Sequence, residues 1–246
     1  SGGGVFLRLD PDGDGSEENF LLGLTATTSS SPILGNQYGL ITDFIENSGR
    51  DPDNLPRHVL MSGQSEGSEY VTVQGSFLNE DIFGGQNDDR LIGGGGSDAI
   101  YGKAGNDTFV VNLSNVENLS SLHPSDHLAF LDGGDGIDTV ELSGDNISID
   151  LSLIEVGRLT SVEVVNINGT GNNSLTLTMA GLIGATDQEN TLHILGGSDD
   201  TLTLINADSA WAPTGLTDTR DGQLFEGYFL GDALAWVDTE INIQIA

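Results

Sequence analysis

The sequence lacks cysteine and has very few basic residues. None of its 246 residues is a cysteine, which excludes disulfides, zinc–thiolate sites and cysteine nucleophiles. Only 7 lysines and arginines stand against 38 aspartates and glutamates, so the formal net charge is −31. Because phosphate binding needs a basic patch, we expect no nucleic-acid partner, and the same charge disfavours an anionic membrane surface. Multivalent cations are the natural small partners of such a chain.

Long apolar runs and aromatic residues are also scarce. The chain has no apolar run of the length that a membrane span needs. Its N-terminal Ser1-Gly2-Gly3-Gly4 lacks the basic and apolar regions of a classical export signal. Hydrophobic residues make up 37% and aromatics 6%, and the 35 glycines raise the entropy cost of folding. An extracellular protein without disulfides often gains stability from bound metal, so we expect the metal-free chain to be marginal or unfolded.

Consecutive nine-residue units occupy residues 75–110. They read GSFLNEDIF, GGQNDDRLI, GGGGSDAIY and GKAGNDTFV. Each opens with glycine, carries an acid at its sixth place and has a large apolar residue at its eighth. A further unit, GGDGIDTVE, stands alone at 133–141, and a degenerate trace, GGSDDTLTL, follows at 196–204. One such unit cannot bury its own apolar face, so the units must stack.

The unit length predicts a parallel β-roll. The first six residues of a unit form a glycine-rich turn, and the last three form a short strand whose central side chain points inward. Turns alternate between two sides, so turns two units apart lie above one another, which brings Glu80 near Asp98 and Asp89 near Asp107. Stacked carboxylates repel each other, and a Ca²⁺ ion between them would remove the repulsion. Backbone carbonyls would complete its shell of about six to eight oxygens.

These units resemble the GGxGxDxUx nonapeptides of the RTX (repeats-in-toxin) family. The resemblance implies a calcium-bound β-roll and export by type I secretion. It is weaker in the first unit, where Glu80 replaces Asp and Ser76 replaces the second glycine. The residues predicted to line the calcium sites, through side chains or backbone, are Glu80, Gly84, Gln86, Asn87, Asp89, Gly93, Gly95, Gly96, Asp98, Gly102, Ala104, Gly105, Asp107, Gly133, Asp135, Gly136 and Asp138.

The C-terminal sequence carries a second resemblance. The stretch HILGGSDDTLTL, Trp211 and the final GQLFEGYFLGDALAWVDTEINIQIA are similar to the terminal module of large RTX adhesins of the biofilm-associated type. No basic residue follows Arg220, and the last residues are apolar and extended. Both traits suit an uncleaved C-terminal signal for type I secretion.

A separate acidic motif lies near the N-terminus, in LDPDGDGSEENF. Asp10, Asp12 and Asp14 have the spacing of the first ligands of an EF-hand loop, and Glu18 fits its ninth position. Leu21 stands where the bidentate glutamate should be. We therefore expect a partial calcium loop, with a solvated acidic turn as the alternative.

Two patterns imitate catalytic motifs. Gly63–Gly67 matches the G-x-S-x-G nucleophile elbow, but the following sequence predicts a strand where the elbow requires a helix. His123 and His127 are spaced as in a zinc protease, but the glutamate of H-E-x-x-H is missing and Pro124 opposes a helix. We therefore expect no enzyme.

The predicted architecture is all-β: a calcium-bound parallel β-roll flanked by an N-terminal β-module and a C-terminal β-rich capping and secretion-signal module. We place the divisions at 1–74, 75–112 (the roll), 113–195 (a β-solenoid or sandwich-like extension that includes 133–141) and 196–246. Single helical turns are expected within 113–122 and 179–186.

The leading functional hypothesis is a calcium-binding, non-catalytic region of a secreted adhesin at the bacterial cell surface. It would stay unfolded in the cytosol and fold on Ca²⁺ outside, with the type I secretion machinery as a partner and a host-cell or matrix surface reached through the parent adhesin. Two alternatives remain open. One is a calcium-dependent sugar- or peptide-binding module formed by residues 1–74, and the other is the RTX tail of a secreted lipase or protease.

Overall fold

The computed structural model describes strands at 4–9, 18–24 and 58–61 and the ranges 71–120, 129–187, 189–205 and 211–246. The chain divides into two compact units, Ser1–Pro56 and Arg57–Ala246. In the first unit, β1 (Gly4–Leu9) pairs antiparallel with β2 (Glu18–Leu24). No helix in the described part of the chain is long and apolar enough to cross a membrane.

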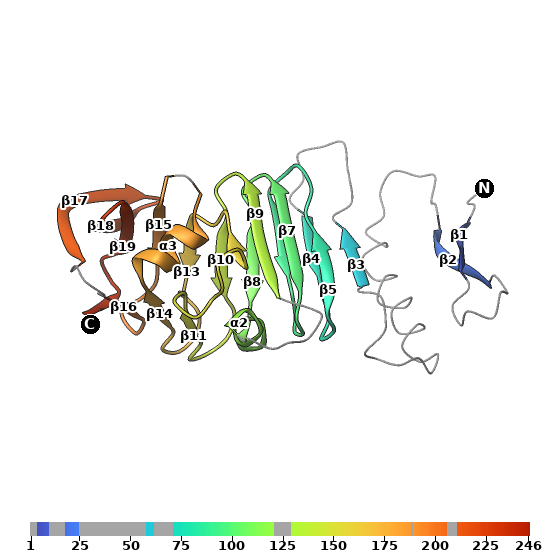
Figure 1. Ribbon diagram of the computed structural model, residues 1–246, viewed down its shortest axis with the longest axis horizontal. Coiled ribbons are helices and arrows are strands. Elements are labelled where there is room, and N and C mark those ends of the chain that lie inside the picture. Colours follow the sequence, from blue (N-terminus) through green and yellow to red (C-terminus); the bar gives the residue numbers. More distant parts are fainter. Residues whose placement is uncertain are drawn as a thin grey trace. The chain divides into compact units, whose positions relative to one another are not determined.

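The nine-residue repeats, which lie in the second compact unit, form a parallel β-roll (Figure 1). Strands that pair in parallel lie two repeats apart in the sequence. Val71 pairs with Asp89, Asp81 pairs with Ala99 and Arg90 pairs with Thr108. This spacing confirms a coil of 18 residues. The strands are β3 (His58–Met61), β4 (Val71–Gln74), β5 (Glu80–Phe83), β6 (Asp89–Ile92), β7 (Ala99–Ala104) and β8 (Thr108–Val111). Two of them, β3 and β4, fall within the range 1–74 that the sequence assigned to a separate module.

The strand interior follows the repeat. The apolar residue at the eighth place of each unit points inward and is at most 1% exposed, while most of its neighbours in the strand are half-buried and two, Ala99 and Val110, are buried. The inward residues are Ile82, Leu91, Ile100, Phe109 and Val140. Because each short strand sends only one or two side chains into the core, the coils depend on stacking to bury them.

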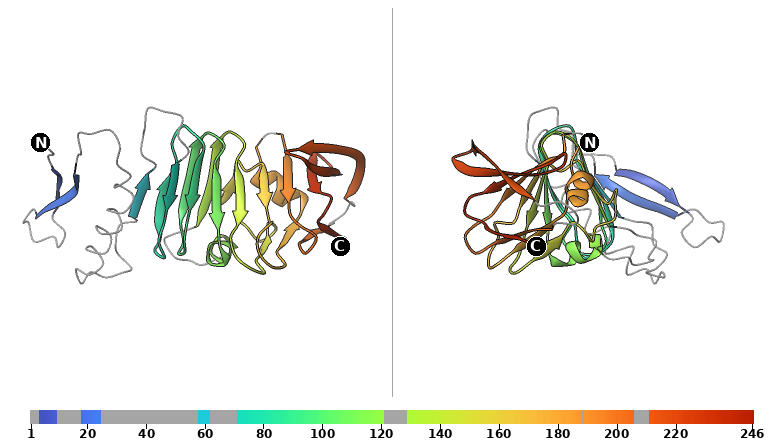
Figure 2. Two further views of the ribbon diagram at one scale, coloured as in Figure 1. Left: turned by 180° about the vertical axis from the view of Figure 1, so that it is seen from behind. Right: turned by 60° about the vertical axis from the view of Figure 1, so that its left-hand side comes forward.

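The solenoid continues beyond the repeats, through β9 (Phe130–Asp135), β10 (Thr139–Leu142), β11 (Ser148–Asp150), β12 (Leu159–Thr160), β13 (Val164–Asn166), β14 (Ser174–Leu177), β15 (Thr191–Leu195) and β16 (Thr201–Leu204). One sheet, the long sheet, runs β17-β18-β19-β15-β13-β10-β8-β6-β4. The second sheet, β12-β9-β7-β5-β3, faces it at the repeats, and the third sheet, β11-β14-β16-β20, takes over farther along. Figure 2 shows these strands side by side in successive coils.

The coils lengthen where the repeats end. Thr108 pairs with Thr139, 31 residues on, and Thr139 pairs with Val164, 25 residues on. The extra residues include α2 (Leu113–Ser120), and a later coil includes α3 (Met179–Ala185). Both helices were expected as single turns, but they span eight and seven residues. The predicted strand at 147–154 is shorter than expected, because only Ser148–Asp150 is extended.

The C-terminal segment ends the long sheet with antiparallel strands. They are β17 (Ala212–Arg220), β18 (Gln223–Leu230) and β19 (Ala233–Asp238), and β19 also pairs in parallel with β15. The last strand, β20 (Asn242–Ile245), joins the third sheet beside β16. The C-terminal segment thus adds strands to the long sheet and to the third sheet.

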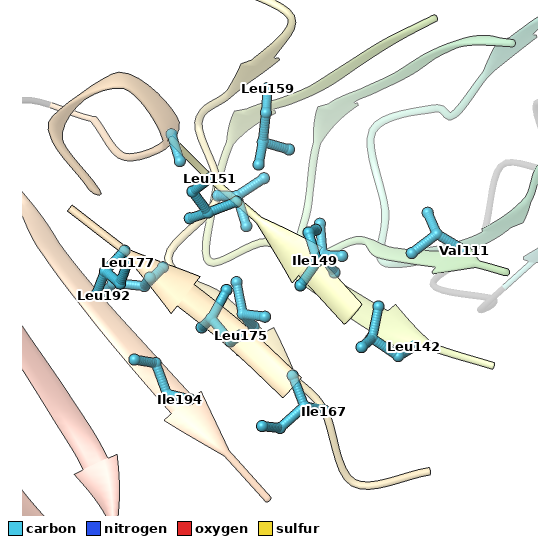
Figure 3. Close-up of a cluster of buried hydrophobic side chains, with 14 of the residues drawn as sticks. Val111, Leu142, Ile149, Leu151, Leu159, Ile167, Leu175, Leu177, Leu192 and Ile194 are labelled. Atoms are coloured by element: carbon cyan, nitrogen blue, oxygen red, sulfur yellow. The ribbon is translucent and has the colours of Figure 1, made fainter. Parts of the chain in front are cut away.

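A single hydrophobic cluster fills the described part of the second unit, from Val73 in β4 to Ile241 before β20. Figure 3 shows its middle section, where side chains of the long and third sheets meet. Ile149, Leu175 and Leu202 lie on consecutive third-sheet strands and are 0% exposed. This shared core holds the glycine-rich turns in register.

Candidate metal centre

The turns that precede the strands form two stacks. The first turn stack contains 75–80 and 93–98, which lead into β5 and β7 of the second sheet. The second turn stack contains 84–89, 102–107 and 133–138, which lead into β6, β8 and β10 of the long sheet. The acids at the sixth place of the five units therefore lie in two columns, Glu80 with Asp98 and Asp89 with Asp107 and Asp138.

Within each stack, backbone N–H groups donate to carboxylates of the next turn. Glu80 N–H donates to Asp98 Oδ1 at 3.0 Å, in the first turn stack. In the second, Asp89 N–H donates to Asp107 Oδ1 and Asp107 N–H donates to Asp138 Oδ1, both at 2.7 Å. The structure thus brings Asp138 into the column of Asp89 and Asp107, although α2 separates its unit from the other four in sequence.

The first glycine of each turn is needed for close stacking. A Cβ on Gly75, Gly84 or Gly102 would collide with the carbonyl oxygen of the corresponding glycine in the next turn. On Gly102 and Gly133 it would also meet Oδ2 of the aspartate in the same turn. Only glycine allows a carbonyl and a carboxylate to approach this closely.

Three turns share a second backbone feature, positive φ at their second and fourth residues. These residues are Gly94 and Gly96, Lys103 and Gly105, and Gly134 and Gly136. The turns 75–80 and 84–89, which are fully described, have no residue with positive φ. The stacks therefore contain two kinds of turn, which the motif alone did not distinguish.

The two kinds of turn differ in what satisfies the carboxylate. In the two turns without positive φ, an N–H group of the turn caps its own carboxylate: Ser76 N–H donates to Glu80 at 3.0 and 3.1 Å, and Gly85 N–H donates to Asp89 Oδ2 at 2.6 Å. In the three described turns with positive φ, no such bond forms. Oδ2 of Asp107 and Oδ2 of Asp138 are both buried without a hydrogen-bond partner.

Asp107 and Asp138 are 1% and 0% exposed. Burial raises the pKa of Asp107 to about 6, with a smaller upward contribution from the charge of Asp89. Burial likewise raises the pKa of Asp138 to about 7, and the charges of Asp107 and Glu163 add to it. A buried carboxylate with an unsatisfied oxygen is costly unless a cation or a proton neutralises it.

This donor set fits calcium. The groups that converge are carboxylate and carbonyl oxygens, which are the ligands that Ca²⁺ prefers, and two of the carboxylate oxygens lack any other partner. No three Asp, Glu or His side chains converge on one point in the described ranges. Turn carbonyls such as that of Gly133, which lies against Gly102, would therefore have to share in holding an ion.

The first turn stack ends in amides. Asn112, Asn115 and Asn118, in and just before α2, cover the turn 93–98. The Asn115 side chain donates to Asp98 Oδ2 at 3.2 Å and the Asn118 side chain donates to the Gly96 carbonyl at 2.6 Å, while the Asn112 side chain donates to the Gly94 carbonyl. The motif search missed these residues, although three asparagines at intervals of three after the last repeat were a visible signal.

The fifth place of the unit, a free position in the motif, carries a second ladder. Asn106 N–H donates to Asp88 Oδ1 at 2.7 Å, and Ile137 N–H donates to Asn106 Oδ1 at 2.9 Å. On the other side, Ser97 N–H donates to Asn79 Oδ1 at 2.8 Å. Sequence reasoning gave these side chains no role, yet they tie successive turns together.

The remaining predicted residues have varied positions. Gln86, Asn87 and Asp135 are exposed, and the Asp135 carbonyl accepts from Gly105 N–H at 3.0 Å. Gly95 is buried and Ala104 is half-buried. Glu18 begins β2. Asp10, Asp12 and Asp14 lie outside the described residues, as do Gly63–Gly67 and the two histidines at 123 and 127.

Comparison with known proteins supports the repeat assignment. Residues 74–109 match the family model of the RTX calcium-binding nonapeptide repeat, in four copies. Neither the curated proteins nor the solved structures gave a match to the chain. The segment that builds the first coils of the solenoid is therefore an array of RTX calcium-binding repeats.

Proposed function

We propose that the second unit is a calcium-dependent folding module, the non-catalytic RTX region of a secreted protein. The observation that carries the proposal is the pair of buried carboxylate oxygens, Asp107 Oδ2 and Asp138 Oδ2, which have no hydrogen-bond partner among the described residues. They occur in turns of one backbone type, stacked in one column. Such an arrangement is unfavourable for the protein alone and suits a site for a cation.

The chain's own residues prepare this site. Gly102 and Gly133 let the turns approach, and the backbone N–H groups of Asp89 and Asp107 hold one oxygen of each following carboxylate. This leaves the second oxygen of Asp107 and of Asp138 free to bind. Bound calcium would supply the positive charge that offsets the repulsion between stacked carboxylates.

Folding then depends on the calcium concentration. Calcium modules that work outside cells bind with dissociation constants of roughly 10⁻⁴–10⁻³ M. Each ion that binds only the folded state stabilises it by RT ln(1 + [Ca²⁺]/Kd), so several sites together decide the state of a marginal domain. Where calcium is scarce, the same carboxylates favour the unfolded chain.

We further propose that the parent protein is an adhesin exported by type I secretion. RTX repeats are typical of secreted proteins, and the C-terminal stretch that resembles the terminal module of RTX adhesins contains the antiparallel strands β18 and β19. In this proposal the chain passes the secretion machinery unfolded and folds on Ca²⁺ outside. The parent adhesin would then bind a host-cell or matrix surface.

A calcium titration of the complete chain tests the folding proposal. Far-ultraviolet circular dichroism should show a weaker β-signal and a lower melting temperature in excess chelator, and both should rise cooperatively on addition of CaCl₂. Asp107→Asn combined with Asp138→Asn should move the midpoint to higher calcium, while Asp232→Asn, a change at an exposed residue, should not. An unchanged β-signal and melting temperature in chelator would refute the proposal.

Export is tested separately. The chain, fused behind a passenger protein and co-expressed with a type I transporter, should reach the medium faster when external calcium is millimolar. Removing β19 and β20 should abolish that export. Equal export of the truncated and complete chains would count against a C-terminal signal.

A further inference from the structure

The second turn stack does not end with the last RTX motif. Asp138 N–H donates to Glu163 Oε2 at 2.9 Å, as Asp107 N–H donates to Asp138 Oδ1. Thr139 pairs with Val164, and Asp138 and Glu163 directly precede these two residues. Glu163 is therefore the equivalent of Asp138 in the next coil. The column of acids is therefore Asp89, Asp107, Asp138 and Glu163.

Ser161 takes the place of the first glycine of a turn. Asp132 pairs with Thr160, which puts Ser161 opposite Gly133. A Cβ on Gly133 would meet the Ser161 carbonyl oxygen, just as a Cβ on Gly102 would meet the Gly133 carbonyl oxygen. Ser161 has a φ of 53°, a left-handed conformation that costs a serine energy.

The turn itself is shortened, which hid it from the motif search. Gly133 and Asp138 are five residues apart, whereas Ser161 and Glu163 are two apart, with the fully buried Val162 between them. The strands on both sides nevertheless keep their register with the preceding coil. A glutamate, one methylene longer than aspartate, reaches the column from this shorter turn.

The two unpartnered oxygens face two successive gaps in the column. Asp107 Oδ2 and the Gly133 carbonyl lie together beside Gly102, between the turns 102–107 and 133–138. Asp138 Oδ2 and the Ser161 carbonyl lie together beside Gly133, one coil farther on. Each buried, unpartnered oxygen thus has its own neighbouring carbonyl and its own following acid.

We propose that Asp138, Glu163 and the carbonyl oxygen of Ser161 form a further calcium site, one coil beyond the last RTX motif. The inference rests on the proposed function, because it extends the same column. The shortened turn offers fewer carbonyls than an RTX turn, and Glu163 is only half-buried. Water must complete the shell, so this site binds calcium more weakly than the site between Asp107 and Asp138.

Counting bound ions in the complete chain tests the site. Native mass spectrometry and calorimetric titration with CaCl₂ are applied to the wild type, to Glu163→Gln and to Glu240→Gln, the last being the same change at an exposed residue. Glutamine retains an oxygen that can accept from Asp138 N–H. We expect Glu163→Gln to bind one ion fewer, with the tighter sites retained, and Glu240→Gln to match the wild type.

The outcomes separate this inference from the proposed function. If the wild type binds no calcium, the proposed function fails. If Glu163→Gln binds as many ions as the wild type with equal affinities, only the additional site is refuted.

Crystals of the wild type grown with Tb³⁺ give a result even if the variant does not fold. Anomalous density between Asp138 and Glu163 would support the site. Density only at the RTX turns would overturn it.

Discussion

Equivalent carboxylates in the turn stacks have different partners, and this difference separates structural from ion-binding positions. Glu80 and Asp89 are capped by N–H groups of their own turns, and Asp98 is capped by an asparagine amide. Asp107 and Asp138 each retain a buried oxygen without a partner. A metal site in this protein thus requires an acidic residue and also a carboxylate oxygen that accepts no hydrogen bond from the backbone.

Glycine substitutions give a matched test of turn stacking. Gly102→Ala should destabilise the calcium-bound protein by about 1–3 kcal/mol, because the new methyl group collides with the Gly133 carbonyl and with Asp107. Gly184→Ala, in α3 with open space at its Cβ, should stabilise by about 0.5–1 kcal/mol. Urea unfolding in CaCl₂ measures both free energies, and equal effects of the two changes would contradict the stacking argument.

At the residue scale, the sequence predicted the positions of the carboxylates but not their differences. The nine-residue period places Asp89 beside Asp107 whatever the turn geometry, so that proximity followed from spacing alone. Whether Gly85 N–H caps its aspartate depends on the φ of the turn, and a motif that specifies only residue types does not encode that choice. Glu163 was missed because its turn had lost three residues and with them the repeat pattern.

At the scale of elements, α2 replaces a continuation of the first turn stack. Its Asn115 amide meets Asp98 Oδ2, on the side where a further turn would otherwise stack. An amide N–H satisfies a carboxylate without adding charge, so this stack ends without requiring another cation. The helix thereby limits one column of acids while the other continues to Glu163.

Changing that amide to an acid tests the role of α2. Asn115→Asp keeps the oxygen that accepts from Asn112 N–H, but places a carboxylate against Asp98. In chelator we expect a loss of about 1.5–3 kcal/mol, the cost typical of a lost hydrogen bond to a charged group. Added CaCl₂ should recover part of it, because the pair now resembles the other stacked acids.

Asn172→Asp is the control, since Asn172 is exposed and lies outside both turn stacks. Thermal midpoints in chelator and in CaCl₂ report the difference. If the two variants behave alike, the cap has no special role.

The sheets beyond the repeats were harder to predict than the roll. Segments such as 174–177 and 201–204 alternate apolar and polar residues, which predicts a strand but not the sheet it joins. The change from the second to the third sheet depends on the longer coils after α2, and coil length without a repeat cannot be read from local alternation. The existence of strands was therefore predictable, whereas the third sheet was not.

At the scale of the whole molecule, the chain carries a net charge of −31, and one continuous core runs through the described part of its second unit. The buried acids gain no hydrophobic energy, so each must be neutralised by an ion or a proton, or satisfied by a hydrogen bond such as that from an amide. At Asp98 the side-chain amide of Asn115 donates a hydrogen bond to the carboxylate, and at Asp107, Asp138 and Glu163 we propose bound calcium. Without calcium, protons are the remaining counter-charge, which makes the stability of the metal-free protein depend on pH.

The sign of that dependence follows from the raised pKa values. An aspartate with an unfolded pKa of 3.8 and folded pKa values of about 6 at Asp107 and about 7 at Asp138 binds more protons in the folded state. Folding stability without calcium should therefore fall as pH rises through these values. Buried His193, whose pKa is lowered to about 4, opposes the trend, because its contribution is full above its unfolded pKa of 6.5 and is lost on acidification.

The prediction is a reversal of the pH dependence by calcium. Between pH 5.5 and 7.5, urea midpoints in chelator should decrease with pH, since two carboxyls outweigh one imidazole. In CaCl₂ they should increase, because the ion competes with protons for the same oxygens. Asp138→Asn removes the carboxyl whose pKa is about 7, so it should flatten the slope in chelator and leave the His193 contribution intact. Parallel slopes with and without calcium would mean that ions and protons bind elsewhere than in this column.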